Sequence, residues 1–201
     1  MAFARRHVMF AAVLLAFVPV ALAQTSEKPV ALPDLVIGKA DAPIVIEEYA
    51  SLTCSHCAAF HTTVLPELKK AYIDPGKVKL IYRDFPLDEL AVAAAMTGRC
   101  AGDKREALIG QIYATQDVWL AQGKNPLEGL FSLAEPYGMD REMMAKCLSN
   151  ADIFNAIVAD RDKFEKAVDV EGTPTFVING KKYTGSPDVA GFESVLKALV
   201  K

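Results

Sequence analysis

The amino-acid sequence predicts an α/β fold, in which a mixed central sheet is flanked by helices and interrupted by an inserted helical block. Short apolar segments rich in β-branched residues occur near both ends of the chain, at 35–37, 44–50, 78–82 and 174–178. Between Asp88 and about Lys166, in contrast, no segment has the composition of a strand. Strands on both sides of a helical block bury their faces best in one shared sheet, so the block is an insertion.

Residues 1–23 have the features of a cleaved export signal. Arg5 and Arg6 precede an apolar run at 8–20, which is too short to span a membrane. Ala21-Leu22-Ala23 then offers a small-x-small cleavage site, so the mature chain is expected to begin at Gln24. An uncleaved anchor is the alternative, and the short apolar run disfavours it. Residues 24–33 are then a short N-terminal tether, and residues 34–201 form one domain.

The charge balance argues against some classes of partner. The chain has 22 basic and 25 acidic side chains, and residues 1–23 contain two basic and no acidic ones. Cleavage therefore moves the net charge from −3 to −5. A negative domain of this kind is not expected to bind nucleic acid or an anionic membrane surface. We also expect no membrane insertion of the mature protein.

The first part of the domain alternates strands with helix. The expected elements are, in order, strand 35–37, a turn at 38–43, strand 44–50, a helix from about 54 to 64, a new helix near Pro66, and strand 78–82 closed by Asp84-Phe85-Pro86. Proline is tolerated in the first turn of a helix, so a kink or break is expected just before Pro66.

The helical insertion covers about residues 88–166, and strands return after it. The expected helices are 88–100, 103–120, one that opens at Asn125-Pro126, 140–148, and 151 to about 168. In the last of these, Ile153, Phe154, Ile157, Val158 and Phe164 recur at helical spacing, and Arg161 is the exception on that face. Strand 174–178, a turn at Asn179-Gly180, edge strand 181–184 and a helix at 188–201 complete the domain.

The central motif is Cys54-Ser55-His56-Cys57, which lies between strand 44–50 and the following helix. A CxxC pair in this strand–turn–helix context indicates a redox-active dithiol. A c-type haem site would need a histidine directly after Cys57, where Ala58 stands. A soft-metal site remains an alternative, because His61 lies one turn beyond Cys57 and could share a metal with both cysteines. A static structural disulfide is a further alternative.

Cys54 has the position of a reactive thiol. At the start of a helix its sulfur lies near unpaired N–H groups and the positive end of the helix dipole, which stabilise a thiolate. A protonated or donating His56 would add to this field, although a solvent-exposed His56 without effect is the alternative. Cys57, one turn further on, is expected to be buried with a higher pKa.

An acidic residue lies in the apolar strand that precedes the motif. Glu48 stands six positions before Cys54, and a buried acid there is costly unless it is paired. We expect Glu48 to relay a proton to Cys57. The strand can also turn so that Glu48 or Glu47 faces solvent, and the sequence leaves open which of the two acids is buried.

Cys100 and Cys147 form a second pair, 47 positions apart, within the helical insertion. Cys100 shares a helix face with Val92 and Met96, and Cys147 shares one with Met143 and Met144, so both should point into the core of the insertion. An oxidising compartment favours a structural disulfide between them, and two separate buried thiols are the alternative.

These motifs together resemble the DsbA family of periplasmic thiol:disulfide oxidoreductases. The matching residues are Glu48, Cys54-Ser55-His56-Cys57, Tyr82-Arg83-Asp84-Phe85-Pro86 and Gly172-Thr173-Pro174-Thr175-Phe176, over about residues 34–201. The dipeptide Ser55-His56 and the threonine before the proline differ from the best-known members of the family. The second cysteine pair resembles DsbA-like proteins of α-proteobacteria.

The resemblance implies a thioredoxin fold and a protein disulfide oxidase without a cofactor. It implies that Thr173–Pro174 is a cis bond packed beside Cys54, where the Thr173 backbone can pair with a substrate strand. The expected substrates are reduced exported proteins, and the expected reoxidant is a quinone-linked membrane partner of the DsbB type. We expect a monomer in the periplasm. A disulfide isomerase or reductase on the same fold is the alternative.

Overall fold

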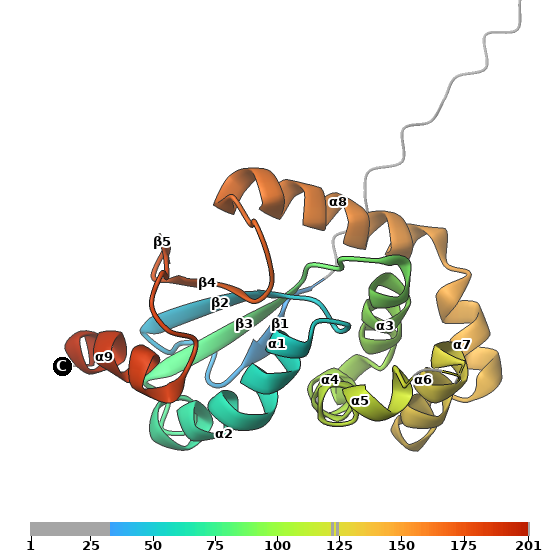
Figure 1. The fold of residues 1–201 in the computed structure, drawn as a ribbon, viewed down its shortest axis with the longest axis horizontal. Helices are drawn as coiled ribbons and strands as arrows, with labels where there is room; N and C mark the ends of the chain where they lie inside the picture. The colour runs from blue at the N-terminus through green and yellow to red at the C-terminus, as the bar shows by residue number, and fades with distance from the viewer. Residues whose placement is uncertain (1–32, 122, 124, 201) are drawn as a thin grey trace, which may run out of the picture.

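A computed structural model describes residues 33–121, 123 and 125–200 of the chain. It contains a five-stranded mixed sheet in the order β1-β3-β2-β4-β5, flanked by helices (Figure 1). The predicted fold class is confirmed. The predicted signal at 1–23 and the tether at 24–33, apart from Pro33, lie outside the described residues.

The strands are close to those predicted, with β2 at the centre of the sheet. Their bounds are β1 Leu35–Ile37, β2 Ile44–Ala50, β3 Val78–Asp84, β4 Thr175–Ile178 and β5 Lys181–Lys182. β2 runs parallel to β3 and antiparallel to β4. β3 is two residues longer than predicted, because its end pairs with Tyr49 and Ala50 of β2. β5 is two residues shorter than predicted, and the turn before it has positive φ at Asn179 and Gly180.

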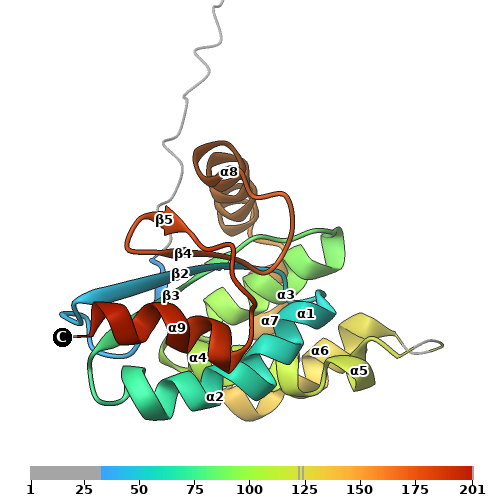
Figure 2. The ribbon, with the colours of Figure 1, turned by 60° about the vertical axis from the view of Figure 1, so that its left-hand side comes forward.

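Alternation along β2 sends neighbouring side chains to two differently covered faces of the sheet. Ile44, Ile46 and Ala50 belong to the main core, together with Cys57 and Phe60 of the motif helix. Tyr49 belongs to a smaller core with Phe164 of α8 (Ala151–Val168). Figure 2 shows α1, α2 and α9 on one side of the sheet and α8 on the other.

The helix that carries the motif continues through Pro66 with altered hydrogen bonding. It comprises α1 (Ser55–Ala59), a π-helical segment Phe60–Val64, α2 (Leu65–Leu68) and a second π-helical segment Lys69–Ile73. Pro66 lies in the first turn of α2, directly after the first π-helical segment. Since proline has no N–H to donate to the preceding turn, a change of hydrogen-bond register there is expected.

The helical insertion packs beside the sheet and contains more breaks than predicted (Figure 1). Its helices are α3 Glu89–Cys100, α4 Arg105–Ala114, α5 Gln116–Trp119, α6 Pro126–Ala134, α7 Arg141–Leu148 and α8, and α9 (Val189–Leu199) closes the domain. The single helix predicted at 103–120 is wrong, because the chain departs from helical geometry at Thr115 (φ −119°) between α4 and α5.

Short polar side chains act as N-caps at the start of α3, α6, α7, α8 and α9. Each accepts a hydrogen bond from a backbone N–H of its first turn, and the capping residues are Asp88, Asn125, Asp140, Asn150 and Asp188. The prediction that Phe154 lies on the buried face of α8 is wrong, since it is 45% exposed. Ile157 and Phe164 of the same face are buried. The edge of α8 at Phe154 therefore lies beyond the reach of the core.

A buried ion cluster joins the sheet to the insertion. The Asp84 carboxylate, at the end of β3, accepts hydrogen bonds from Arg99 Nε (2.6 Å) and Arg105 Nη2 (2.9 Å). Both guanidinium groups also donate to the Pro33 carbonyl, which fixes the point where the chain enters the domain. Removing one partner of such a buried cluster leaves an uncompensated charge and is strongly destabilising.

The structure joins Cys100 and Cys147 in a disulfide, with their Cα atoms 6.2 Å apart. The bond links the last turn of α3 to the last turn of α7. Met96 and Met144 are buried beside it as predicted, but Met143 is 48% exposed and does not share the inward face. The buried face of α7 contains Met144 and Cys147, and Met143, in the first turn after the N-cap Asp140, lies outside this face.

Loss of this disulfide should destabilise the oxidised protein. The bond spans 47 positions of sequence, so the chain-entropy model gives at most about 4 kcal/mol for its removal. We expect the double substitution Cys100→Ala/Cys147→Ala to lower the urea concentration at the midpoint of unfolding. The variant and the unchanged protein are compared with the Cys54–Cys57 disulfide oxidised in both. Unchanged midpoints would show that the bond adds nothing to stability.

Candidate functional site: the CxxC motif

Cys54 lies at the carboxyl end of the central strand, where the sheet edge meets the first turn of α1. Its backbone is extended (φ −82°, ψ 121°), so it is the N-cap residue, and its sulfur lies beside the free N–H groups of the helix. Cys54 is half-buried, whereas Cys57 is fully buried. Both cysteines are free thiols here. One sulfur is therefore open to attack and the other is enclosed.

The surroundings of Cys54 stabilise its thiolate and lower its pKa from 9.0 to about 5. The largest contribution is a hydrogen bond from the Cys57 thiol, which burial of Cys54 partly opposes. Thr173 and the backbone N–H groups of Cys57 and His56 lower the pKa further. Donors aimed at one sulfur make it a good nucleophile and a good leaving group near neutral pH.

Thr173–Pro174 lies beside Cys54, and its peptide bond is cis. The Thr173 carbonyl oxygen is 3.2 Å from Cys54 Sγ, a contact in which a protonated thiol can donate. Thr173 Oγ1 is buried and has no hydrogen-bond partner among the described residues. Since a thiolate can only accept a hydrogen bond, the contact with the Thr173 carbonyl is available only to the protonated thiol, although Thr173 as a whole lowers the pKa of Cys54.

Burial acts in the opposite direction on Cys57. Desolvation raises the pKa of its thiol, and the hydrogen bond to Cys54 and the nearby charge of Glu48 raise it further. The two sulfurs of one motif therefore have strongly separated acidities. When the disulfide opens, Cys54 can remain a thiolate, while the Cys57 sulfur requires a proton.

The two adjacent acids of β2 face opposite sides of the sheet. Glu48 is fully buried on the face of the motif helix, so it is the buried acid that the sequence left undecided. Its carboxylate is 2.9 Å and 3.1 Å from His61 Nε2. Glu47 turns to the other face, where its carboxylate is 2.8 Å from Arg83 Nη2.

The metal alternative requires His61 to face the two cysteines, and it does not. His61 Nε2 is bound to Glu48, and its ring stacks on Tyr113 with centroids 4.2 Å apart. Across the described residues, no group of three or more His, Cys, Asp or Glu side chains is arranged to hold a metal ion. The arrangement around Cys54 and Cys57 supports thiol chemistry instead.

The residues between the two cysteines are exposed. Neither the Ser55 hydroxyl nor the His56 ring makes a hydrogen bond within the described part of the chain, and the contribution of His56 to the Cys54 pKa comes from its backbone N–H. No contact of the His56 ring with the Cys54 sulfur therefore supports a side-chain effect on the thiolate. The modulating role of Ser55 and His56 stays a prediction.

Residues of the insertion support the motif in ways that the sequence did not indicate. The Gln116 amide donates to the carbonyl oxygens of Leu52 (2.8 Å) and Cys54 (3.1 Å). The Tyr113 hydroxyl is 3.2 Å from the Ser51 carbonyl oxygen and 3.1 Å from the Tyr82 hydroxyl. No periodicity or spacing marks these residues, because their contacts depend on how the insertion folds back over α1.

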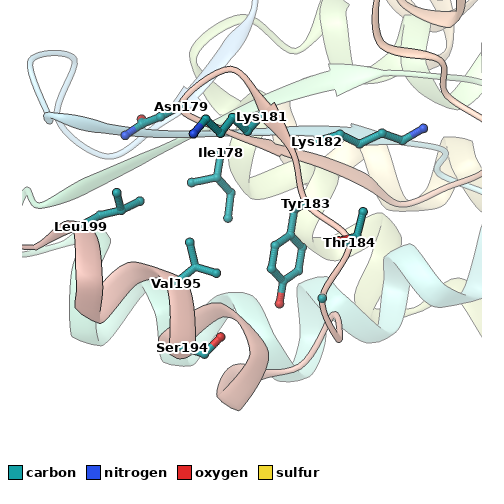
Figure 3. Close-up of a pocket in the computed structure, with 10 residues that line it drawn as sticks. Ile178, Asn179, Lys181, Lys182, Tyr183, Thr184, Ser194, Val195 and Leu199 are labelled. Atoms are coloured by element: carbon teal, nitrogen blue, oxygen red, sulfur yellow. The ribbon is translucent and has the colours of Figure 1, made fainter.

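A pocket of about 480 Å³ lies between β5 and α9, away from the motif (Figure 3). Ile178, Val195 and Leu199 give it an apolar interior, and Lys181 and Lys182 lie along the strand above it. None of the predicted site residues lines this pocket. The candidate site at the half-buried Cys54 therefore lies apart from this pocket.

Comparison with known proteins agrees with this geometry. A thioredoxin family model matches residues 31–198. The crystal structure of Wolbachia pipientis alpha-DsbA1 is 30% identical, covers 83% of this chain and 90% of that one, and superposes with a TM-score of 0.77. The chain belongs to the DsbA family. The predicted family and thioredoxin fold are thus confirmed.

Relatives of this DsbA-family protein carry names of the same kind. A putative protein-disulfide oxidoreductase of Rickettsia bellii is 36% identical over 73% of this chain and 57% of its own length. A probable disulfide bond formation protein D of Bacillus cereus is 32% identical over 82% of this chain and 76% of its own. The chain spans little more than half the length of the Rickettsia proteins that it matches.

The hydrogen bond from Cys57 can be tested by its effect on the Cys54 thiolate. Cys57→Ala removes the donor, whereas Cys57→Ser keeps an O–H in its place. We expect the Cys54 pKa, followed by the ultraviolet absorbance of the thiolate, to rise from about 5 in both variants and to rise further in the alanine variant. Equal values in all three proteins would mean that Cys57 does not stabilise the thiolate.

The low pKa of Cys54 also predicts a pH-dependent stability. The folded pKa is about 5 and the ordinary value is 9.0, so the thiolate adds stability that is fully present above about pH 9 and lost as the pH falls to about 5. As the pH rises from about 5 to about 9, the free energy of unfolding of the reduced protein should therefore increase relative to that of the oxidised protein. Urea unfolding of both forms at several pH values measures this difference. A constant difference across this range would contradict the lowered pKa.

Proposed function

We propose that this DsbA-family protein is a thiol:disulfide oxidase that introduces disulfide bonds into exported proteins in the periplasm. The observation that carries the proposal is the separation of acidity between the half-exposed Cys54 and the buried Cys57. A stabilised Cys54 thiolate favours the reduced enzyme, so the Cys54–Cys57 disulfide tends to accept electrons from substrate thiols.

The proposed reaction has two exchange steps. A substrate thiolate attacks Cys54 Sγ, the Cys54–Cys57 bond breaks, and Cys57 Sγ leaves with the electron pair and takes up a proton. A second substrate thiolate then attacks the substrate sulfur of the mixed disulfide and releases Cys54 as a thiolate. The substrate dithiol becomes a disulfide, and the enzyme disulfide becomes a dithiol with both electrons. Glu48, buried near Cys57, is the proposed proton donor in the first step.

Substrate is proposed to bind along Thr173 and Pro174. The Thr173 carbonyl oxygen lies 3.2 Å from the reactive sulfur, at the start of β4. Backbone groups at this position can pair with an extended substrate segment and hold its cysteine in line with Cys54. Such pairing depends on the substrate backbone, which suits an enzyme that accepts many unfolded proteins.

We also propose a reoxidising partner, a cellular location and an oligomeric state, on the basis of the family and of the sequence. A quinone-linked membrane protein of the DsbB type would reoxidise the dithiol, and the protein would act as a monomer after cleavage near Gln24. In the described part of the chain, no helix has the length and hydropathy that a bilayer crossing needs. A disulfide isomerase or reductase is the second candidate, and one relative of known structure, at 24% identity, carries the name protein-disulfide isomerase.

Two substitutions and one equilibrium test the proposal. Cys57→Ser should trap mixed disulfides between Cys54 and a reduced protein substrate, and Cys54→Ser should abolish oxidative folding of that substrate. Equilibration with a glutathione buffer should give a more oxidising pair than thioredoxin, whose potential is about −270 mV. Activity that persists in Cys54→Ser would remove the mechanism, and a potential near that of thioredoxin would favour the reductase.

A further inference from the structure

His61 lies between the buried acid of the motif and a second opening to solvent. Its side chain is 4% exposed, and Nε2 contacts both oxygens of Glu48. The ring also lines a pocket of about 290 Å³ bounded by β1, the motif helix and α4. The pocket walls include Ile37, Pro66 and Ile109, with the ion pair of Lys69 and Glu106 (2.6 Å) among them.

The second ring nitrogen of His61 is available to that pocket. Nδ1 makes no hydrogen bond to any described residue, and it is not among the fully buried polar atoms that lack a partner. Tyr113 stacks on one face of the ring, and Phe60 and Tyr82 approach it edge-on, so the ring is held in place. One nitrogen therefore faces a buried carboxylate, while the other can meet water.

Glu48 itself has no comparable route to solvent. It is fully buried at the centre of the sheet, between Tyr82 of β3 and Phe176 of β4. Neither Cys54 nor Thr173 lines the pocket beside His61, so this opening is separate from the surface where a substrate would meet the sulfur. A substrate that covers Cys54 would leave the pocket open.

We propose that His61 is a positioning residue that holds Glu48 and connects it with water in the pocket, so that the Cys57 proton travels by this route. The inference rests on the proposed function. When Cys57 Sγ leaves the disulfide, the Glu48 carboxyl gives it a proton. The Glu48 carboxylate then takes the proton from His61 Nε2, and Nδ1 takes one from pocket water. One proton moves from solvent to Cys57, and reoxidation reverses the direction.

Other ionisable groups around the ring do not replace this route. The groups that face His61, Glu48 or the pocket from the surrounding elements are Cys57, Tyr82, Tyr113, Lys69 and Glu106. Burial raises the pKa of Tyr82 and of Tyr113 well above the ordinary value, so both remain neutral. Lys69 and Glu106 neutralise each other in their ion pair.

The test measures a single turnover of the oxidised protein with a dithiol peptide, from about pH 5 to 8 and in both H₂O and D₂O. His61→Gln keeps a donor near Glu48 but cannot relay a proton. We expect the rate to fall by about 10- to 100-fold, with a changed pH profile and a larger solvent isotope effect. In His61→Ala, added imidazole should enter the enlarged pocket and restore a large part of the rate.

Glu128→Gln is the control, because Glu128 pairs with Arg141 on the exposed surface of the insertion and contacts neither Glu48 nor His61. It should leave the isotope effect unchanged. A wild-type rate, pH profile and isotope effect in His61→Gln would overturn the inference. So would a slowed His61→Ala that imidazole fails to restore, since His61 would then serve packing alone. In either case, mixed-disulfide trapping through Cys54 in the same proteins would leave the proposed function standing.

Discussion

The central position of β2 is the constraint on which the other features of the site depend. β2 hydrogen-bonds to β3 on one side and β4 on the other, so its carboxyl end is held rigidly beside the start of β4. The chain leaves this strand and enters the motif helix within a few residues. Cys54 is thereby fixed against the Thr173 carbonyl and the Gln116 amide, which come from segments more than 60 residues away. A site held by a strand and a helix is positioned more precisely than a site on a loop.

Much of this arrangement could be predicted from the sequence because it is local. The β-branched apolar composition of 44–50, the CxxC spacing and the helical spacing of apolar residues each describe features within one or two turns of chain. The strand after Pro174 and the turn at Asn179-Gly180 follow in the same way from local backbone preferences, since proline fixes its φ and Asn-Gly tolerates positive φ. The identity of the family followed from the combination of such local signals.

The parts that the sequence did not predict depend on tertiary packing. The role of Gln116 and Tyr113 exists only because the insertion folds back over α1. The partner of Glu48 could not be chosen from the sequence either, since the sequence suggested only a metal-binding alternative for His61. The exposed positions of Phe154 and Met143 have the same origin, because an apolar residue at the edge of a helix face is buried only if a neighbouring element extends far enough to cover it. In each case the deciding contact joins residues with no regular spacing.

The opposite orientation of Glu47 and Glu48 has a consequence for how this strand can vary. Side chains of a strand alternate with period two, so inserting or deleting one residue within β2 would exchange the two faces. Depending on which side of the change shifts, either Glu47 would lie under the motif helix or Ile44 and Ile46 would leave the main core. Length changes should therefore be tolerated in the turn before β2, at residues 38–43, and not within the strand. In homologous chains of different length, we therefore expect the number of residues between Glu48 and Cys54 to stay the same.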